Sequence, residues 1–496
     1  MKKNQRRLVR LIAIILAVLL AGSAVVSAIF SFAYAEETPA RNSCTLTMEY
    51  LENEQALRVS QRLVYINESS IPLDRVVFYA PANIFRREAT AAYAADDLES
   101  GFAYGYLPGG IDLVDVMVNG AAADYGFQGE GELYLRVACD LAPGESCEFT
   151  FNYYLLLTAN NAFLGVGEYD WRLSNFYFAP AYVNEAYGEF MLSSPVSFTR
   201  WIHTPAADFH ASIALPDGCA LAATGTESSE IIDGARLWSI TAENVRDFAL
   251  SFGEGYKESS EGKIRCLIRQ RGAADDVLEY AEEAIAACES WFGEFPMDGM
   301  DFIQTGDSNA FRSHSGCAWL SEALIKEGGD ELRRAVYYCV AQQYFGFAAY
   351  TQPSSDAWLS DSICEYLSYL ILEELDGSDA YLRALNENIV SSLQLTIPGG
   401  LNVVSDASLM DALEYDIIIR DRGAAVFHEL RTAMGRDELI SGLRNFYQKG
   451  LSADVLTEMD LVNALDAATG RSWEAFLTDW VYNIGDYVNQ DIFWLD

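Results

Sequence analysis

The chain has 496 residues, too many for one ordinary hydrophobic core, so we expect two or three domains. Hydrophobic residues make up 51% of the sequence, which allows a large packed interior and excludes a disordered chain. The formal net charge is −39, with 72 acidic and 33 basic residues, so the chain lacks the basic surface that binding to nucleic acid requires.

Residues 1–35 are predicted to direct export. A basic start that ends at Arg10 precedes an uncharged apolar run over residues 11–32. Small residues at positions 33 and 35, followed by two glutamates, are typical of a signal-peptidase site. Because the run is also long enough to span a bilayer, a cleaved signal peptide and a retained anchor both stay open. Either one makes the protein extracellular or places it at the cell surface, with membrane contact only through residues 11–32 if they are retained.

A β domain is predicted over residues 44–257, after a short link at residues 36–43. Runs such as residues 57–65 and 147–154 alternate apolar and polar side chains. Glycine and proline turns separate these runs, and the sequence shows no helical stretch between them. We therefore expect an antiparallel β-sandwich or an open, saddle-shaped sheet.

Over residues 258–496 the periodicity is mostly helical, so the chain is predicted to be an α+β multidomain protein. Asp437 and Ser472 stand where helix N-caps are expected. Amphipathic helices are predicted over residues 275–292, 331–345, 356–374, 422–432, 437–447 and 459–468.

The cysteines are scattered and form no C-x-x-C pair, which argues against a thiolate zinc site. Cys139 and Cys147 flank a Pro-Gly turn. Two interpretations stay open for them: a disulfide across a hairpin, or buried thiols that act as small hydrophobic side chains.

Two segments of the helical half carry a longer pattern. The first is Gln343-Tyr344-Phe345-Gly346, and the second runs over residues 358–366 as W-L-S-D-S-I-C-E-Y. They resemble the aminopeptidase N family of gluzincin zinc peptidases, in which H-E-x-x-H is followed by Q-W-F-G and a second helix carries W-L-N-E-G-F-A-x-Y. Gln342 and Asp361 are separated in sequence as the second histidine and the ligand glutamate of that family are.

Other segments are similar to the family in the same order along the chain. The resemblance covers roughly residues 44–480, and it implies an N-terminal β domain followed by a thermolysin-like, mostly helical peptidase domain. These segments are residues 65–69, 141–146, 291–296, 422–430 and 473–480.

The resemblance also indicates which residues stand at the family's zinc site. Tyr338 and Gln342 occupy the positions of the two histidine ligands, and Asp361 occupies that of the third ligand. Cys339 stands where the family has its general-base glutamate. A zinc hydrolase needs three good ligands and a carboxylate that accepts a proton from the bound water. Because a neutral phenol and an amide are poor zinc ligands, we expect no cofactor.

Two further positions differ from the family's chemistry. Arg420 stands where the resemblance places the tyrosine that stabilises the transition state. Ser313, His314 and Gly316 lie in the segment that matches the edge strand G-x-M-E-N, whose glutamate binds the free amine of a substrate. Without that carboxylate, the charge-assisted hydrogen bonds to an amine are missing.

We therefore predict an exported, catalytically inactive homologue that binds a peptide or protein in the former substrate cleft and binds no nucleic acid. One alternative is a divergent, active metallopeptidase whose zinc is held by Asp361 together with Asp307 or His314. Another is a structural accessory ectodomain of a membrane complex. A catalytic thiol pair of Cys339 and His314 is a further hypothesis.

Overall fold

The computed structural model describes residues 41–86, 102, 105–270, 272–393, 395, 397 and 400–488. The predicted export segment at residues 1–35 lies outside the described residues, as does most of the predicted link at residues 36–43. The described residues form one compact unit, and the boundary between residues 257 and 258 stays a prediction. In this part of the chain no helix is both long and apolar enough to cross a membrane.

An eight-stranded sheet dominates the first half of the described chain. Its strands alternate inward and outward side chains, and on β8 Phe149, Phe151 and Tyr153 are buried. All its pairings are antiparallel except that of β1 with β14. In spatial order its strands are β16 (Thr226–Ile232), β17 (Ala235–Val245), β14 (Ala207–Pro216), β1 (Asn42–Leu51), β2 (Ala56–Ile66), β8 (Ser146–Leu156), β4 (Gly110–Val118) and β5 (Ala121–Ala122).

Smaller sheets pack on this one through aromatic side chains. The rings of Phe151 and Phe178 stack at 4.7 Å, and Gln61 donates to the backbone oxygen of Phe178 at 2.7 Å. One sheet consists of β15 (Ala220–Ala223), β18 (Ala249–Gly253), β10 (Asp170–Ser174) and β9 (Leu164–Val166); another of β11 (Ala179–Pro180), β3 (Leu73–Tyr79), β7 (Tyr134–Leu141) and β6 (Tyr125–Gln128); and a third of β12 (Val183–Asn184) and β13 (Glu189–Phe190).

A mixed five-stranded sheet opens the second half. Its strand β22 lies at the edge and runs antiparallel to β23, with Ser313 opposite Ala318. The sheet consists of β19 (Lys257–Glu261), β20 (Ile264–Ile268), β21 (Met300–Thr305), β23 (Cys317–Ser321) and β22 (Phe311–His314).

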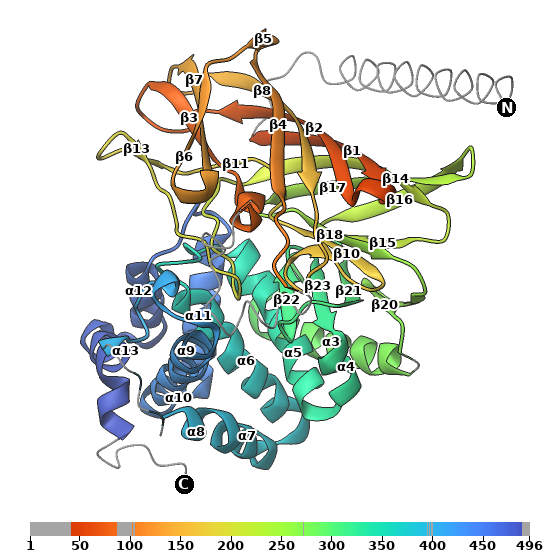
Figure 1. The fold of residues 1–496 in the computed structure, drawn as a ribbon. Coiled ribbons are helices and arrows are strands. Elements are labelled where there is room, and N and C mark those ends of the chain that lie inside the picture. Colours follow the sequence, from red (N-terminus) through yellow and green to blue (C-terminus); the bar gives the residue numbers. More distant parts are fainter. Residues whose placement is uncertain are drawn as a thin grey trace, which may run out of the picture. The chain divides into compact units, whose positions relative to one another are not determined.

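Helices make up the remainder, and all six predicted helices are confirmed in place. Figure 1 shows them on one side of the molecule, in green to blue, with β1–β18 on the other. The α-helices are α3 (Ala273–Phe292), α4 (Glu322–Glu327), α5 (Gly329–Gln342), α6 (Trp358–Asp376), α7 (Ser378–Ala384), α8 (Ser391–Leu393), α9 (Ala412–Tyr415), α10 (Gly423–Met434), α11 (Arg436–Gly450), α12 (Glu458–Thr469) and α13 (Glu474–Val488); π-helical turns are η5 (Gln343–Ala348), η6 (Leu385–Val390) and η9 (Asp416–Arg422); short 3₁₀ turns are η1 (Glu52–Glu54), η2 (Pro81–Phe85), η4 (Glu130–Glu132) and η8 (Ala407–Leu409).

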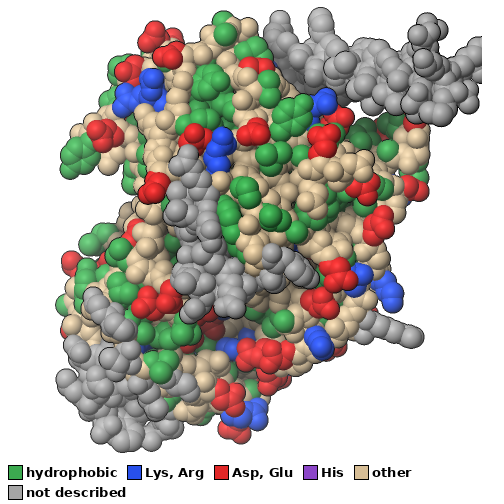
Figure 2. Space-filling model, viewed as in Figure 1, with side chains coloured by type: hydrophobic (Ala, Val, Ile, Leu, Met, Phe, Trp, Pro, Cys, Tyr) green, Lys and Arg blue, Asp and Glu red, His purple; other side chains and the backbone are tan. Residues whose placement is uncertain are grey.

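The predicted order of a multi-sheet β domain followed by a largely helical region is thus confirmed. The two predicted N-caps are wrong. Gly435, with φ of 104°, ends α10 and caps α11 at once, so Asp437 already lies inside the helix. Helix α13 begins only at Glu474, two residues after Ser472. On the face shown in Figure 2 acidic side chains outnumber basic ones, in keeping with the negative net charge.

The cysteines of the chain all lie in the described residues as free thiols. Cys139 on β7 and Cys147 on β8 interact, and this interaction raises the pKa of Cys139 above and lowers that of Cys147 below the usual value of a thiol. A disulfide between them stays a prediction.

Helices α5 and α6 form the centre of the helical region. Every residue of α6 over 358–372 is buried, including Asp361 and Glu365. A Cβ atom on Gly423 would lie 2.0 Å from Ser362 Oγ, so only glycine lets α10 lie this close to α6. The position of α6, and with it that of the two buried carboxylates, depends on this contact.

Candidate functional site

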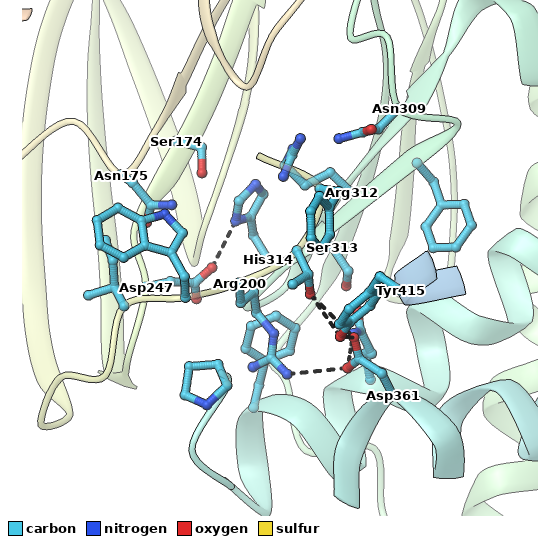
Figure 3. A pocket seen from close by; sticks show the side chains of 18 of the residues that line it. Ser174, Asn175, Arg200, Asp247, Asn309, Arg312, Ser313, His314, Asp361 and Tyr415 are labelled. Carbon is cyan, nitrogen blue, oxygen red and sulfur yellow. Dashed lines mark hydrogen bonds and ion pairs between the residues drawn. The ribbon is translucent and has the colours of Figure 1, made fainter. Parts of the chain in front are cut away.

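A cavity of about 140 Å³ lies between α5, α6, η9, the edge strand β22 and the loop segments around Arg200 and Asp247 (Figure 3). Most residues that the sequence singled out line it, although they come from distant segments of the chain. They are Ser313, His314, Tyr338, Gln342, Asp361 and Arg420.

The other two singled-out residues lie behind the cavity wall. Cys339 is fully buried on α5. Gly316 forms the turn between β22 and β23 with a left-handed φ of 66°, and its N–H donates to Gln343 Oε1 at 2.9 Å. Both therefore act through packing and backbone geometry.

Asp361, in the first turn of α6, is surrounded by hydrogen-bond donors. Its Oδ2 accepts from the hydroxyl of Tyr415 at 2.6 Å and from Thr199 Oγ1 at 3.3 Å. Its Oδ1 accepts from Ser360 Oγ at 2.8 Å and from Gln342 Nε2 at 3.1 Å. With only 3% of its surface exposed, this carboxylate is held entirely by protein groups.

A cation from the β half completes the surroundings of this carboxylate. Arg200 Nη2 lies 3.7 Å from Asp361 Oδ1 and donates to Ser360 Oγ at 3.2 Å. The other end of its guanidinium donates to the backbone oxygen of Gly346 at 2.6 Å, and the group lies 4.8 Å from the ring centre of Phe347. The negative charge of Asp361 is therefore neutralised from within the chain.

Arg420 contributes a second internal ion pair at the cavity. Its Nε and Nη2 donate to Glu365 Oε2 at 3.1 and 2.8 Å, and its Nη1 donates to Asp416 at 3.1 Å. Its guanidinium lies 4.6 Å from the ring centre of Tyr338. Burial by itself raises the pKa of Glu365, but Arg420 and Arg334 outweigh it and hold that pKa below its usual value.

The edge strand places a histidine and a carboxylate together. His314 Nδ1 lies 2.8 Å from Asp247 Oδ2, while Ser315 donates to Oδ1 through its N–H at 3.1 Å and its hydroxyl at 2.5 Å. These hydrogen bonds outweigh the effect of burial and lower the pKa of Asp247, so this group is an anion. Ser313 is held differently, because its hydroxyl accepts from Gln343 Nε2 at 3.1 Å.

Sequence comparison matches the chain to known aminopeptidases, although no family model matches it. Aminopeptidase N of Lactococcus lactis subsp. lactis is 22% identical over 292 residues, which are 52% of this chain and 33% of that protein. Aminopeptidase M1-B of Oryza sativa subsp. japonica is 20% identical over 242 residues, 46% of this chain and 27% of that protein. The chain spans about a third of the length of these curated relatives.

Solved structures of zinc metallopeptidases have a similar fold. The M1 zinc metallopeptidase of Deinococcus radiodurans superposes with a TM-score of 0.57 at 17% identity, covering 89% of this chain and 93% of that one. A mutant of the Deinococcus enzyme bound to a Tyr-Ser-Ala substrate has a TM-score of 0.60 at 16% identity, covering 89% and 94%. The chain is aminopeptidase N-like. The resemblance noted in the sequence is therefore confirmed, together with its two-part fold.

The residues that the resemblance places at the zinc position of this aminopeptidase N-like chain do not fit zinc. Tyr338 keeps its phenol proton, because burial raises its pKa well above the usual value. Gln342 uses its Nε2 as a donor to both Tyr338 and Asp361, and Asp361 already accepts four hydrogen bonds. Within the described residues no three His, Cys, Asp or Glu side chains form a group that could hold a metal ion.

Cys339, which the resemblance places at the general-base position, is poorly suited to accept a proton. Burial raises the pKa of its thiol to about 12, so the thiolate is rare at neutral pH. Among the described residues no hydrogen bond joins Cys339 to His314, whose Nδ1 is directed at Asp247. The geometry gives the hypothesis of a thiol pair no support.

The alternative metal ligands are also engaged elsewhere. Asp307 accepts from Arg312 Nε at 2.9 Å and from the backbone of Asn309 at 3.0 Å. His314 is bound to Asp247, as described above. Neither side chain contacts Asp361 in the described part of the chain.

Sequence reasoning missed the partners of Asp361. Arg200 and Thr199 come from the β half, as does Asp247, the partner of His314, and no short pattern in the sequence connects them with α6 or β22. Tyr415 precedes Arg420 by about one helical turn, and this spacing is the local signal by which the sequence could have identified Tyr415.

Proposed function

We propose that this aminopeptidase N-like protein is exported, does not hydrolyse peptides, and binds a peptide or protein segment in the cavity beside Asp361. The observation that carries the proposal is the contact between Asp361 and Arg200. A guanidinium supplies the positive charge that a metal ion would supply in a zinc peptidase, and the hydroxyl and amide donors fill the other lone pairs.

The thiol of Cys339, at the position where the resemblance places the general base, supports the same conclusion. Hydrolysis by a zinc peptidase needs a base that takes a proton from water, and the thiol of Cys339 has a pKa of about 12. Arg420 offers no hydroxyl to a developing oxyanion, and its guanidinium is already bound to Glu365 and Asp416.

Binding is supported by what remains of the cleft. The cavity has both apolar walls, such as Phe198 and Phe311, and polar groups, and such mixed linings suit peptide segments. Export is supported by the basic and apolar character of residues 1–35.

The test combines metal analysis, turnover and binding on the purified protein. We expect far less than about one zinc per chain, since the site lacks a full set of ligands. We expect no release of p-nitroaniline from alanyl or leucyl p-nitroanilide, and saturable binding of short peptides by calorimetry. Stoichiometric zinc, or turnover that Asp361→Ala abolishes, would overturn the proposal in favour of a divergent metallopeptidase.

A further inference from the structure

Two polar atoms at the cavity have no partner within the described residues. One is Nε2 of His314, a side chain whose residue is only 4% exposed, and the other is Nε of Arg200. Both residues line the same cavity (Figure 3). A buried polar group without a hydrogen bond costs free energy, so a ligand that supplies the missing partner binds at an advantage.

A third donor belongs to Arg312. Its Nε is bound to Asp307 and its Nη2 to the backbone oxygen of Ser197, which leaves Nη1 without a partner in the described structure. Arg312 and His314 are two residues apart on the edge strand β22, and both line the cavity. The unpartnered nitrogens of the cavity therefore belong to two arginines, Arg200 and Arg312, and to His314.

The remaining cavity charges are already paired. Arg420 is bound to Glu365 and Asp416, and Arg246 donates to Asp454 at 2.7 Å. The buried carboxylate of Asp361 accepts four hydrogen bonds, so it offers no site to a ligand's amine.

The carboxylate of Asp247 is likewise filled by His314 and Ser315. The cavity therefore offers hydrogen-bond donors and no free buried anion. An ammonium group of a ligand would lie beside the guanidinium of Arg200 and would find no unpaired carboxylate to bind. A carboxylate of a ligand would instead accept hydrogen bonds from the available donors.

We propose that the cavity binds a carboxylate of a peptide, its C-terminus or an acidic side chain, between Arg200, Arg312 and His314. This rests on the proposed function and specifies its ligand. The bound carboxylate would lie at Nε2 of the His314 imidazole, on the side away from Asp247, and donation to both carboxylates requires the imidazolium form of His314. Guanidinium groups suit this task, because their planar fork matches the two oxygens of a carboxylate.

Calorimetric titration of the full chain with five probes tests the inference. Two probes carry a carboxylate: N-acetyl-Ala-Ala-Ala with a free C-terminus, and N-acetyl-Ala-Glu-Ala amide. Two lack one: N-acetyl-Ala-Ala-Ala amide and N-acetyl-Ala-Gln-Ala amide. The fifth is glutarate alone. We expect the carboxylate peptides to bind at least about tenfold more tightly than their neutral counterparts.

Variants assign the binding to the three residues. Arg312→Lys and Arg200→Lys keep a cation beside Asp307 and Asp361 but lose the fork, and each is expected to weaken carboxylate binding about tenfold. His314→Asn tests the third contact. Arg58→Gln is the matched control, because Arg58 lies half-exposed in an ion pair with Glu49 on the large sheet. Thermal unfolding of each variant shows that it is folded.

The outcomes separate the two proposals. Equal affinity for the carboxylate and neutral peptides overturns the carboxylate inference and leaves peptide binding intact, as does carboxylate binding that none of the three cavity variants weakens. Binding of glutarate with no binding of any peptide supports the carboxylate site and overturns the peptide-binding function. No binding of any probe overturns both.

Discussion

The two faces of the α5–α6 pair are built from different kinds of interaction. On the face toward the sheet, Gln343 makes four hydrogen bonds, which reach Gly316, Ser313, His314 and Cys339. It thereby holds the turn after β22 against the helix. This residue belongs to the segment that resembles the family's Q-W-F-G motif.

On the cavity face two buried carboxylates form ion pairs with arginines of the same chain. Asp361 faces Arg200, and Glu365 faces Arg420. Tyr338, Asp361 and Arg420, which the resemblance places at positions of the family's catalytic groups, line the cavity here, and Cys339 lies behind its wall. The comparison teaches that Gln343, from the segment that carries the resemblance, holds packed elements together, whereas the carboxylates of the cavity face are paired with arginines of the same chain.

Removal of Arg420 gives the sharpest test of a structural role for the cavity face. Arg420→Ala leaves the buried carboxylate of Glu365 with Arg334, at 3.4 Å, as its only charged partner and with the hydroxyl of Tyr369, at 2.9 Å; we expect a loss of about 3–5 kcal/mol in the free energy of unfolding. Urea unfolding measures it. Arg58→Ala, which breaks an exposed pair, should cost less than about 1 kcal/mol. Similar small losses for both variants would show that the Arg420 pair contributes nothing to stability.

The packing face is tested by Gln343→Leu. The change leaves the N–H of Gly316 and the backbone oxygens of His314 and Cys339 without this partner. We therefore expect the free energy of unfolding to fall by about 2–3 kcal/mol. The same urea titration applies. Gln448→Leu is the control, because its long contact with the backbone of Phe292 lies at 3.5 Å. If the two variants unfold alike, Gln343 is not the residue that holds the turn.

A buried histidine beside the cavity makes stability depend on pH. His203 Nδ1 lies 3.1 Å from the hydroxyl of Tyr350, which lines the cavity. Burial, assisted by Arg246, lowers the pKa of His203 to about 3. The folded state therefore stays neutral where the unfolded chain takes up a proton. The contribution of the neutral His203 to the free energy of unfolding is complete above about pH 6.5 and is lost as the pH falls toward 3.

By pH 5 this loss amounts to about 2 kcal/mol. Urea midpoints at pH 7.5 and pH 5 measure it, and His203→Asn should reduce the drop. His428→Asn removes the matched histidine of α10, whose pKa burial and Arg431 lower to about 4. A drop that neither substitution changes would assign the acid sensitivity to other groups.

The smallest expected effect is at the contact between α6 and α10. Gly423→Ala places a Cβ 2.0 Å from Ser362 Oγ. We expect the free energy of unfolding to fall by roughly 1–2 kcal/mol, because the cost of overpacking exceeds the gain in helix propensity. A double-mutant cycle with Ser362→Gly should show that the two changes together cost less than their sum. Strict additivity would mean that the close approach is relieved elsewhere.

Much of the fold followed from local pattern. The period of two along β2 and β8 and the helical period along α3, α5 and α11 depend on which side chains are buried, and the sequence displays that directly. The helix starts were less accurate, since Gly435 serves two helices at once and left no cap position for Asp437. Most of the five-stranded sheet was not predicted, because its inner strands β21 and β23 are buried on both faces and do not alternate.

By itself the sequence determined the order of the elements, and through the family resemblance it predicted which residues stand at the family's zinc position. Both are properties of residues close together in the chain, so a motif suffices to find them. Only the tertiary structure decided what those groups do. Asp361 meets Arg200 and Thr199 because a segment of the β half, more than 150 residues earlier, packs on α6. Ion pairs and unfilled hydrogen bonds act at contact distance, and contacts across such separations exist only in the folded chain.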